Sequence, residues 1–298
     1  MQILVAVDQN SYSAHAVVEV ARLAANTWAN VSLLGVQSRN VPAPAGAGPS
    51  ADRRTADGPL PRALIDYRRR FLAHFDGKDC PYAPADFDPA LVEVAKKIYE
   101  TRPPSPAARK NLTLRLRIGS LGREILSEAR EAESDLVVLG CDQANGCGWS
   151  GGAGLPLKVA NEAPCSVLVV KKKKAVKRII CCLDQERVSQ PSLEMINQMV
   201  SLHDGAQLVI IGIGGHQQLD AEVEKKMDRV LRYYHARGID PWIEMVDAAA
   251  LDTFIARESR WGMMAFWMGP QSILEKVFPR RKVNKLIKGG DASVLILR

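Results

Sequence analysis

The sequence predicts an α/β protein made of two tandem, doubly wound parallel sheets, each with five strands and with helices on both faces. Two observations predict this fold class. Short apolar runs alternate with segments whose apolar residues recur at helical spacing, and the whole series occurs twice along 298 residues. Strands that alternate with helices form parallel sheets, and right-handed crossovers place the helices on both faces.

The two copies open in the same way. The run ILVAVDQNSYSAHAVVEVARLAA starts at residue 3, and RIICCLDQERVSQPSLEMINQMV starts at residue 178. Each reads as an apolar strand, an Asp-Gln pair, a polar turn and an amphipathic helix. Asp8 and Asp184 therefore hold the same place, directly after the first strand of each half.

The two copies also close in the same way. SDLVVLG (134–140) resembles GMMAFWMG (262–269), and APCSVLVV (163–170) resembles GDASVLIL (290–297). Between the opening and the close, each copy has two further strands and a helix. The expected second strands are 31–37 and 206–214, the third strands 112–119 and 241–246, and the helices 123–132 and 251–259.

The repeat predicts two domains, 1–172 and 176–298, joined at the lysine run 171–174. The first domain is longer because of an insert at about 38–110. Its first part, 38–60, is rich in Pro, Ala and Gly, and helices are expected at 62–75 and 89–101. The insert is interpreted either as a partner-binding arm or as a tolerated surface excursion.

Composition excludes several classes of protein. Apolar residues make up 47% and charged residues 24%, with a net charge of +7. No apolar run reaches the length of a membrane span, and MQILVAVD enters a strand without the features of a signal peptide. We expect a cytoplasmic protein.

The lysine run could bind nucleic acid, but the absence of interleaved aromatic residues favours a solvated linker.

Catalytic motifs are missing from the sequence. The five histidines are scattered, and there is no HExxH, GxSxG or GxxxxGK[ST] pattern, so we expect no enzyme. Ser11 and Ser13 are expected to cap the following helix rather than to act as nucleophiles.

The six cysteines include no CxxC pair and are expected to be reduced thiols.

The stretch LGCDQANGCGWSGGAG, residues 139–154, indicates a ligand site. Ligands of open parallel α/β sheets bind at the carboxyl ends of strands, where Asp8 and Gly140 are expected to lie on neighbouring strands. A helix is expected from Leu155, and the free N–H groups at a helix start suit a phosphate. The glycines would let the backbone approach that phosphate closely.

The segments ILVAVD, SLGREILSEAREAESDLVVLG and KVANEAPCSVLVV resemble the universal stress protein family in its tandem two-domain form. The resemblance covers most of both halves and excludes the insert. It implies an adenine-nucleotide alpha-hydrolase-like, Rossmann-like fold. It also implies that nucleotide-binding members hold ATP through a G-x2-G-x9-G-[S/T] motif after strand four and an Asp after strand one.

The first half matches this motif only in part. Gly140 fills the first slot, whereas Gln143, Ala153 and Gly154 stand at the other three. The extra glycines could restore a shifted loop that binds ATP or AMP, with Mg²⁺, and the alternative is a flexible surface turn in a decayed site. The residues expected to bind the nucleotide are Ala6, Asp8, Val36, Gly140, Gly151, Gly152, Gly154 and Leu155.

The second half departs further from the motif. Asp184 and Gly269 are kept, but the loop after Gly269 has no further glycine. Arg280 and Arg281 could hold an anion by charge in a weaker second site. Basic residues on such a helix are more often simply solvated, and that interpretation is favoured.

Two functions of different classes stay open. One is a regulatory protein that senses ATP or AMP in the first half. The other is a scaffold that binds an unidentified protein partner through the domain pairing and the insert. The resemblance also implies that the terminal strands 166–170 and 293–297 pair across the halves as a pseudo-dimer, and a homodimer of the whole chain is expected.

Overall fold

A computed structural model gives the fold of the chain. It describes residues 1–38, 58–75, 79–82, 90–101, 108–141, 148–149, 154–171, 176–183, 189–213, 221–260, 262–268 and 279–298. The chain divides into two compact units, Met1–Lys172 and Lys173–Arg298. Each unit is described by itself, and the pairing of the halves through their terminal strands stays a prediction.

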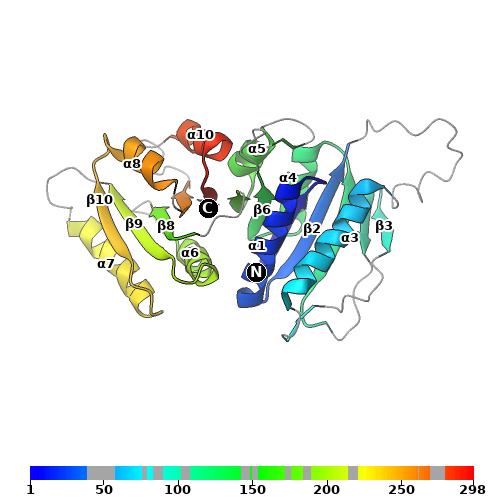
Figure 1. Cartoon of the computed structure of the whole chain (residues 1–298), viewed down its shortest axis with the longest axis horizontal. Coiled ribbons are helices and arrows are strands. Elements are labelled where there is room, and N and C mark those ends of the chain that lie inside the picture. Colours follow the sequence, from blue (N-terminus) through cyan, green and yellow to red (C-terminus); the bar gives the residue numbers. More distant parts are fainter. Residues whose placement is uncertain are drawn as a thin grey trace, which may run out of the picture. The chain divides into compact units, whose positions relative to one another are not determined.

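The first unit is a mixed, mostly parallel sheet (Figure 1). Its strands follow the order β7-β6-β1-β2-β5-β4-β3, and the first five are mutually parallel. The elements are β1 Gln2–Val7, α1 Ser11–Thr27, β2 Asn30–Gln37, α3 Pro59–Leu72, η1 Ala73–Phe75, β3 Leu91–Ala95, β4 Ile98–Thr101, β5 Leu112–Ile118, α4 Leu121–Glu131, β6 Leu136–Gly140, α5 Leu155–Glu162 and β7 Ser166–Val170.

The second unit has a parallel sheet with the order β10-β9-β8-β11-β12. Counted along each half, both units place their parallel strands in the order 3-2-1-4-5, so the predicted doubly wound fold is confirmed. The elements are β8 Arg178–Cys182, α6 Gln190–Leu202, β9 Gln207–Ile213, α7 Ala221–His235, β10 Trp242–Val246, α8 Leu251–Glu258, β11 Gly262–Trp267, α10 Arg280–Gly289 and β12 Ser293–Leu297.

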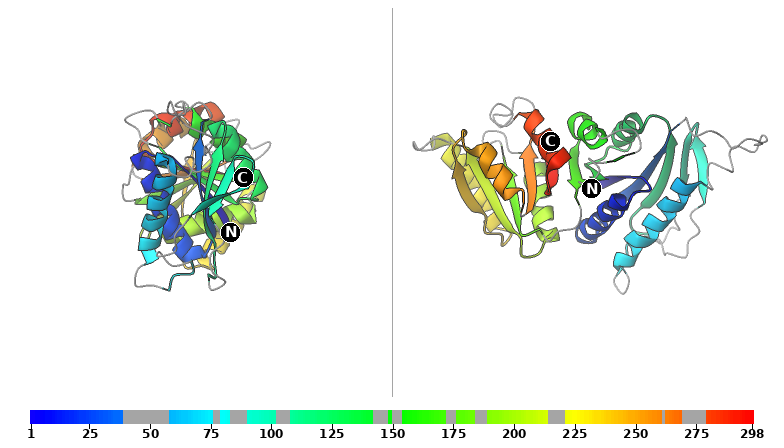
Figure 2. Two further views of the ribbon diagram at one scale, coloured as in Figure 1. Left: turned by 90° about the vertical axis from the view of Figure 1, so that its right-hand side faces the viewer. Right: turned by 45° about the horizontal axis from the view of Figure 1, so that its top comes forward.

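Helices cover both faces of each sheet (Figure 2). In the first unit α1 packs beside α3, and α4 packs beside α5 on the opposite face. The central strands are therefore buried on both sides, which explains why they read as continuous apolar runs rather than alternating ones. Among the described helices, none is long and apolar enough to cross a membrane.

The prediction of a helix at 89–101 is wrong. This segment forms β3 and β4, an antiparallel hairpin, and β4 pairs antiparallel with β5. Val92 and Val94 stand on either side of Glu93, at the spacing of a strand, and the turn places Lys97 at φ 67. The hairpin adds two strands to the five predicted for the first sheet.

Helix α3 belongs to the core of the first unit although it lies within the predicted insert 38–110. Parallel β2 and β5 need a crossover, and α3 provides it. Leu60 and Leu64 lie so close to Gly35 that a Cβ at this glycine would come within 3.1 to 3.2 Å of them. The predicted helix at 62–75 is confirmed, while residues 39–57 lie outside the described residues.

Candidate functional site

Asp8 lies at the carboxyl end of β1, as the sequence predicts. Strand β1 is the direct neighbour of β6, with Ala6 paired to Leu139, one residue before Gly140. The ends of these two strands therefore meet at one edge of the sheet, which is the edge where parallel α/β sheets bind ligands.

The carboxylate of Asp8 is fully engaged by its own chain. Oδ1 accepts hydrogen bonds from the backbone N–H of Asn10 (3.0 Å) and from Ser13 Oγ (2.8 Å). Oδ2 accepts from Asn10 Nδ2 (2.6 Å) and from the phenol of Tyr12. With four donors around two oxygens and 9% of its surface exposed, Asp8 is held as a structural acceptor.

The expected capping of α1 by Ser11 or Ser13 is wrong. Asn10 is the N-cap residue and makes no side-chain capping bond. Ser13 Oγ instead accepts from the backbone N–H of Asp8 (3.0 Å) while donating to its carboxylate. The short turn after β1 therefore closes on Asp8 rather than on the helix, because the carboxylate is the stronger acceptor.

Two tyrosines from different helices of the first unit, Tyr12 of α1 and Tyr67 of α3, donate hydrogen bonds to Asp8. Tyr67, on α3, donates to the carbonyl oxygens of Asp8 (2.9 Å) and Asn10 (3.1 Å). Burial raises the pKa of Tyr12 and of Tyr67 above that of a free phenol, and the neighbouring Asp8 raises both further. Both phenols therefore stay protonated and act as donors at neutral pH.

Trp149 completes this aromatic cluster, which consists of Tyr12, Tyr67 and Trp149. Its ring lies 5.5 Å from the ring of Tyr12, and its Nε1 donates to the carbonyl oxygen of Gly140 (3.0 Å). Gly140 itself presses on the start of α1, since a Cβ there would lie 2.2 Å from the carbonyl oxygen of Tyr12. Gly140 is needed for this close packing.

The sequence analysis missed all three aromatic residues. Tyr12 follows Asp8 by four positions, which was a usable signal. Tyr67 lies in a segment interpreted as an insert, and Trp149 lies among the loop glycines, so neither had a pattern that pointed to Asp8.

The other residues predicted for the first site are placed as follows. Ala6 is buried within β1, and Val36 is half-buried near the end of β2. Gly154 is the N-cap of α5 without a side-chain capping bond, and Leu155 is buried as the first residue of that helix. Gly151 and Gly152 lie outside the described residues.

The predicted second site is described only at α10. Asp184 and Gly269 lie outside the described residues. Arg280 is half-buried and Arg281 is exposed at the start of α10, where Pro279 is the N-cap. The next residue, Lys282, pairs with Asp252 of α8 at 2.6 Å. One of the three basic residues at this end is thus used to join two helices.

Cys141 corrects the expectation of reduced thiols. It is disulfide-bonded, and Lys171 Nζ lies 2.9 Å from its Sγ. The expectation rested on the absence of a CxxC pair and on an assumed compartment, not on the geometry after β6. Cys80, Cys165, Cys181 and Cys182 are free.

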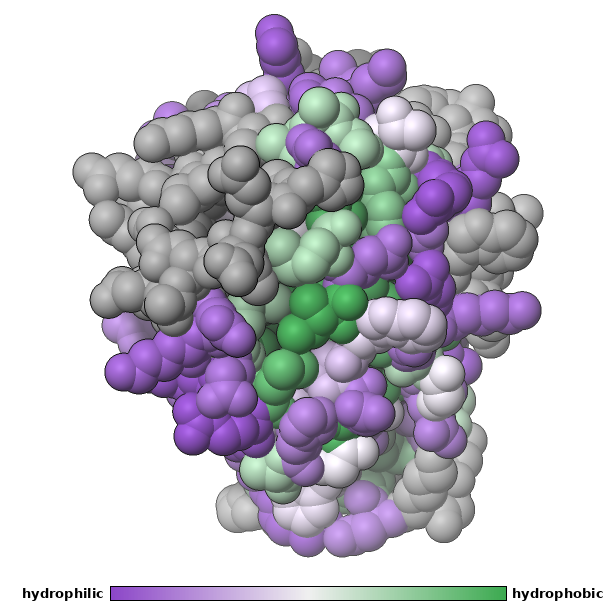
Figure 3. Space-filling model, turned by 90° about the vertical axis from the view of Figure 1, so that its left-hand side faces the viewer, coloured by the Kyte–Doolittle hydropathy of each residue, from purple (hydrophilic) through white to green (hydrophobic). Residues whose placement is uncertain are grey.

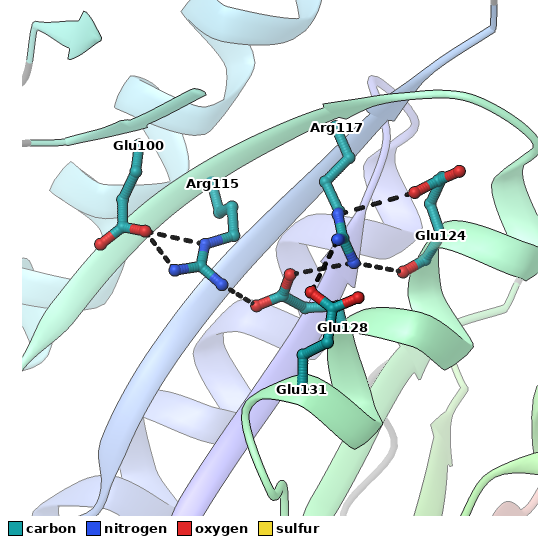
Figure 4. A network of polar contacts seen from close by, with 6 residues as sticks. All are labelled: Glu100, Arg115, Arg117, Glu124, Glu128 and Glu131. Atoms are coloured by element: carbon teal, nitrogen blue, oxygen red, sulfur yellow. Dashed lines mark hydrogen bonds and ion pairs between the residues drawn. The ribbon is translucent and has the colours of Figure 1, made fainter. Parts of the chain in front are cut away.

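A second polar cluster joins β4, β5 and α4 (Figure 4). Arg115 and Arg117 of β5 point toward the buried carboxylate of Glu128, with Arg117 Nη1 3.3 Å from Glu128 Oε2. Around this centre, Glu100 pairs with Arg115, while Glu124 and Glu131 pair with Arg117. Every carboxylate here faces a guanidinium, so the cluster is structural, and the described residues hold no group of His, Cys, Asp and Glu suited to a metal.

The described geometry can be compared with known proteins. The family model of the universal stress protein family matches residues 1–171. The chain belongs to the universal stress protein family. No protein with curated annotation matches the chain.

Two solved structures that cover nearly the whole chain support the fold of both halves. A universal stress protein from Archaeoglobus fulgidus is similar over 100% of this chain and 98% of its own, with 14% identity and a TM-score of 0.60. The protein PA1789 from Pseudomonas aeruginosa covers 99% of this chain and 92% of its own, with 14% identity and a TM-score of 0.57. A family protein from Arabidopsis thaliana with AMP bound covers 64% of this chain and 98% of its own, with 14% identity and a TM-score of 0.33.

The described part of the first site does not fit an adenosine held by Asp8. In such a site the carboxylate needs an open lone pair for the ligand. Here Asn10, Tyr12 and Ser13 take both oxygens, and Tyr67 takes the carbonyl oxygen. A ligand would have to displace one of these donors, either the exposed amide of Asn10 or the buried phenol of Tyr12, and loss of the phenol also costs its packing against Trp149.

Proposed function

We propose that this universal stress protein is a non-catalytic regulatory protein that acts by binding another protein, without a nucleotide on Asp8. The observation that carries the proposal is the closed state of Asp8, whose two carboxylate oxygens accept four hydrogen bonds from Asn10, Tyr12 and Ser13. A ligand-binding carboxylate loses its role when its lone pairs are used within the protein.

The competing function is the binding of ATP or AMP, with Mg²⁺, in the first half. Its support is positional: Asp8 and Gly140 end neighbouring strands, and Gly154 starts α5 on the connection that leaves β6. This function would use Ala6, Val36 and Leu155 together with the loop glycines, and it would require at least one of the donors to leave Asp8.

The two functions are separated by calorimetric titration of the nucleotide-stripped chain with Mg²⁺ and ATP, and then with AMP. We expect no heat of binding and no thermal stabilisation with millimolar nucleotide. Because a ligand at ~100 times its dissociation constant stabilises a protein by about 2.7 kcal/mol, even weak binding would be visible as a shift of the melting temperature.

Two variants make the result specific to the site. Asp8→Asn removes the carboxylate at the carboxyl end of β1. Asp135→Asn is the matched control, because Asp135 accepts from the backbone of Gln2 (2.7 Å) at the opposite end of the same strand. Micromolar binding at one site that is lost in Asp8→Asn and kept in Asp135→Asn would overturn the proposal in favour of a nucleotide sensor.

A further inference from the structure

The third strands of the two halves can be aligned residue by residue. Ala6 and Cys182, each two residues before the Asp of its half, pair with Leu34 and Ile211. The next residues of the second strands are Gly35 and Gly212. Gly35 pairs with Leu116 of β5, and Gly212 pairs with Met245 of β10, so Leu116 and Met245 are equivalent.

These equivalent positions differ sharply in exposure. Leu116 is fully buried, whereas 45% of Met245 is exposed, and 59% of Trp242 on the same strand is exposed. The cause is the β3–β4 hairpin, which places Tyr99 opposite Leu116. In the part of the second unit that the structure describes, no strand lies outside β10, and the view of this end shows apolar residues among hydrophilic ones (Figure 3).

The same alignment shows an inverted charge. Arg115 of β5 is equivalent to Glu244 of β10. Arg115 meets Glu100 directly across the ladder, with Nε 2.9 Å from Oε2. Glu244 lies 3.8 Å from both Arg178 and Arg257, beyond hydrogen-bonding distance. Its carboxylate therefore keeps capacity for a closer basic partner.

The two outer edges are also protected differently. The outermost strand of the first unit, β3, is interrupted by a bulge between Glu93 and Ala95 and is followed by Lys96 and Lys97. Bulges and lysines are devices that prevent further strands from pairing. Strand β10 is regularly paired to β9 and carries two exposed large apolar side chains, and of such protective features only Pro241, directly before the strand, is present.

We propose that β10 binds an extended segment of a partner protein as an added antiparallel strand, with a basic residue opposite Glu244 and apolar residues facing Val246 and Met245. The segment would take the place that β4 occupies on β5, with the charges reversed. Main-chain hydrogen bonds would supply affinity and the Glu244 contact would supply specificity. A second copy of β10 fits less well, since antiparallel pairing centred on Glu244 would set two carboxylates opposite each other.

This inference deepens the proposed protein-binding function, and it is tested with peptides rather than with nucleotide. The probes are the hairpin segment LVEVAKKIYET, residues 91–101, and the same peptide with Glu100→Arg. Binding of each labelled peptide to the full chain is followed by fluorescence anisotropy, and hydrogen exchange locates the protected amides. We expect the Arg peptide to bind about tenfold more tightly than the natural one and to protect residues 242–246.

Variants of the chain sharpen this test. Glu244→Arg is expected to reverse the preference between the two peptides. Met245→Lys places a charge on the edge and is expected to abolish binding of both. Val94→Lys is the matched control, because Val94 is an exposed apolar residue on the outer strand of the other unit, and it should leave binding unchanged.

Four outcomes would overturn the inference. The first three are equal binding of the two peptides to the chain and to its Glu244→Arg variant, protection of amides outside residues 242–246, and no binding of either peptide. A concentration-dependent dimer that Met245→Lys dissociates would also overturn it, by assigning the edge to a second copy. Nucleotide titration reports on Asp8 alone, so failure there leaves this result intact.

Discussion

The two halves bury an equivalent carboxylate but neutralise it from different strands. Glu128 is the eighth residue of α4 and Glu258 the eighth of α8, and both are buried. In the first half the partners are Arg115 and Arg117 of the third strand, while in the second half the strand partner is Arg178 of the first strand.

This difference shows which part of the buried ion pair is shared by the two halves. The helix position of the acid is common to both halves, and the source of the counter-charge is not. Once Arg178 supplies the positive charge, the third strand no longer needs an arginine and can carry Glu244. The edge of the second sheet can therefore carry a negative charge next to the arginines that pair with Glu258.

The largest expected loss of stability follows from neutralising Glu128. In Glu128→Gln, Arg117, whose side chain is only 5% exposed, keeps its charge without its most buried partner. Breaking a buried pair in this way costs about 3 to 5 kcal/mol. Glu258→Gln should cost about half of that or less, because the side chain of Arg178 is 28% exposed and water screens it.

Hydrogen exchange measured separately in each half distinguishes the two losses. A Glu258→Gln variant that loses as much stability as Glu128→Gln would contradict the comparison. It would show that exposure of the arginine does not decide the cost of leaving it unpaired.

The equivalent edge positions predict the next effect. Leu116→Ala should destabilise the first half by about 3 kcal/mol, as expected for a buried leucine that leaves a cavity. Met245→Ala should change the second half by no more than about 0.5 kcal/mol, because the side chain is already exposed. Chemical denaturation, monitored by hydrogen exchange, measures the stability of both variants. A large loss of stability in Met245→Ala would mean that β10 is covered in solution.

Removal of the Tyr12 hydroxyl is expected to lower the free energy of unfolding by less than Glu128→Gln or Leu116→Ala does. Tyr12→Phe removes the hydrogen bonds to Asp8 and from Asn10 while keeping the ring against Trp149, and it should cost about 1.5 to 3 kcal/mol, as for a hydrogen bond to a charged group. Tyr233→Phe is the matched control, since its phenol donates to Glu194 (2.5 Å) on a half-buried surface and should cost less. Thermal unfolding of both variants tests the order, and a reversed order would argue against a tightly closed Asp8.

The doubly wound fold of both halves could be predicted from the sequence, and the closure of the site could not. The repeat that starts at residues 3 and 178 indicated both sheets, because local apolar patterns survive in each copy. The hairpin at 91–101 was missed because its apolar residues also fit helical spacing. The contact between Tyr67 and Asp8 joins residues 59 positions apart, and no local pattern encodes that approach.

The last prediction concerns the loss of folded stability at alkaline pH, which is absent at neutral pH and begins above about pH 10. Burial raises the pKa of Tyr12, Tyr67, Tyr82 and Tyr234, and it raises that of Tyr233 to about 12. A raised pKa in the folded state contributes stability that is complete below about pH 10 and is lost as the pH rises through the folded pKa. Phenolate absorbance should therefore appear together with unfolding, and titration of these five tyrosines near pH 10 in the folded chain would contradict this.

The contact between Gly140 and the start of α1 has a consequence for how this glycine is read. A side chain at this position would collide with the backbone of Tyr12 whether or not any ligand is bound. Packing within the domain is therefore enough to require glycine here. In this chain, a glycine at the first place of a phosphate-binding pattern is by itself no evidence for a bound ligand.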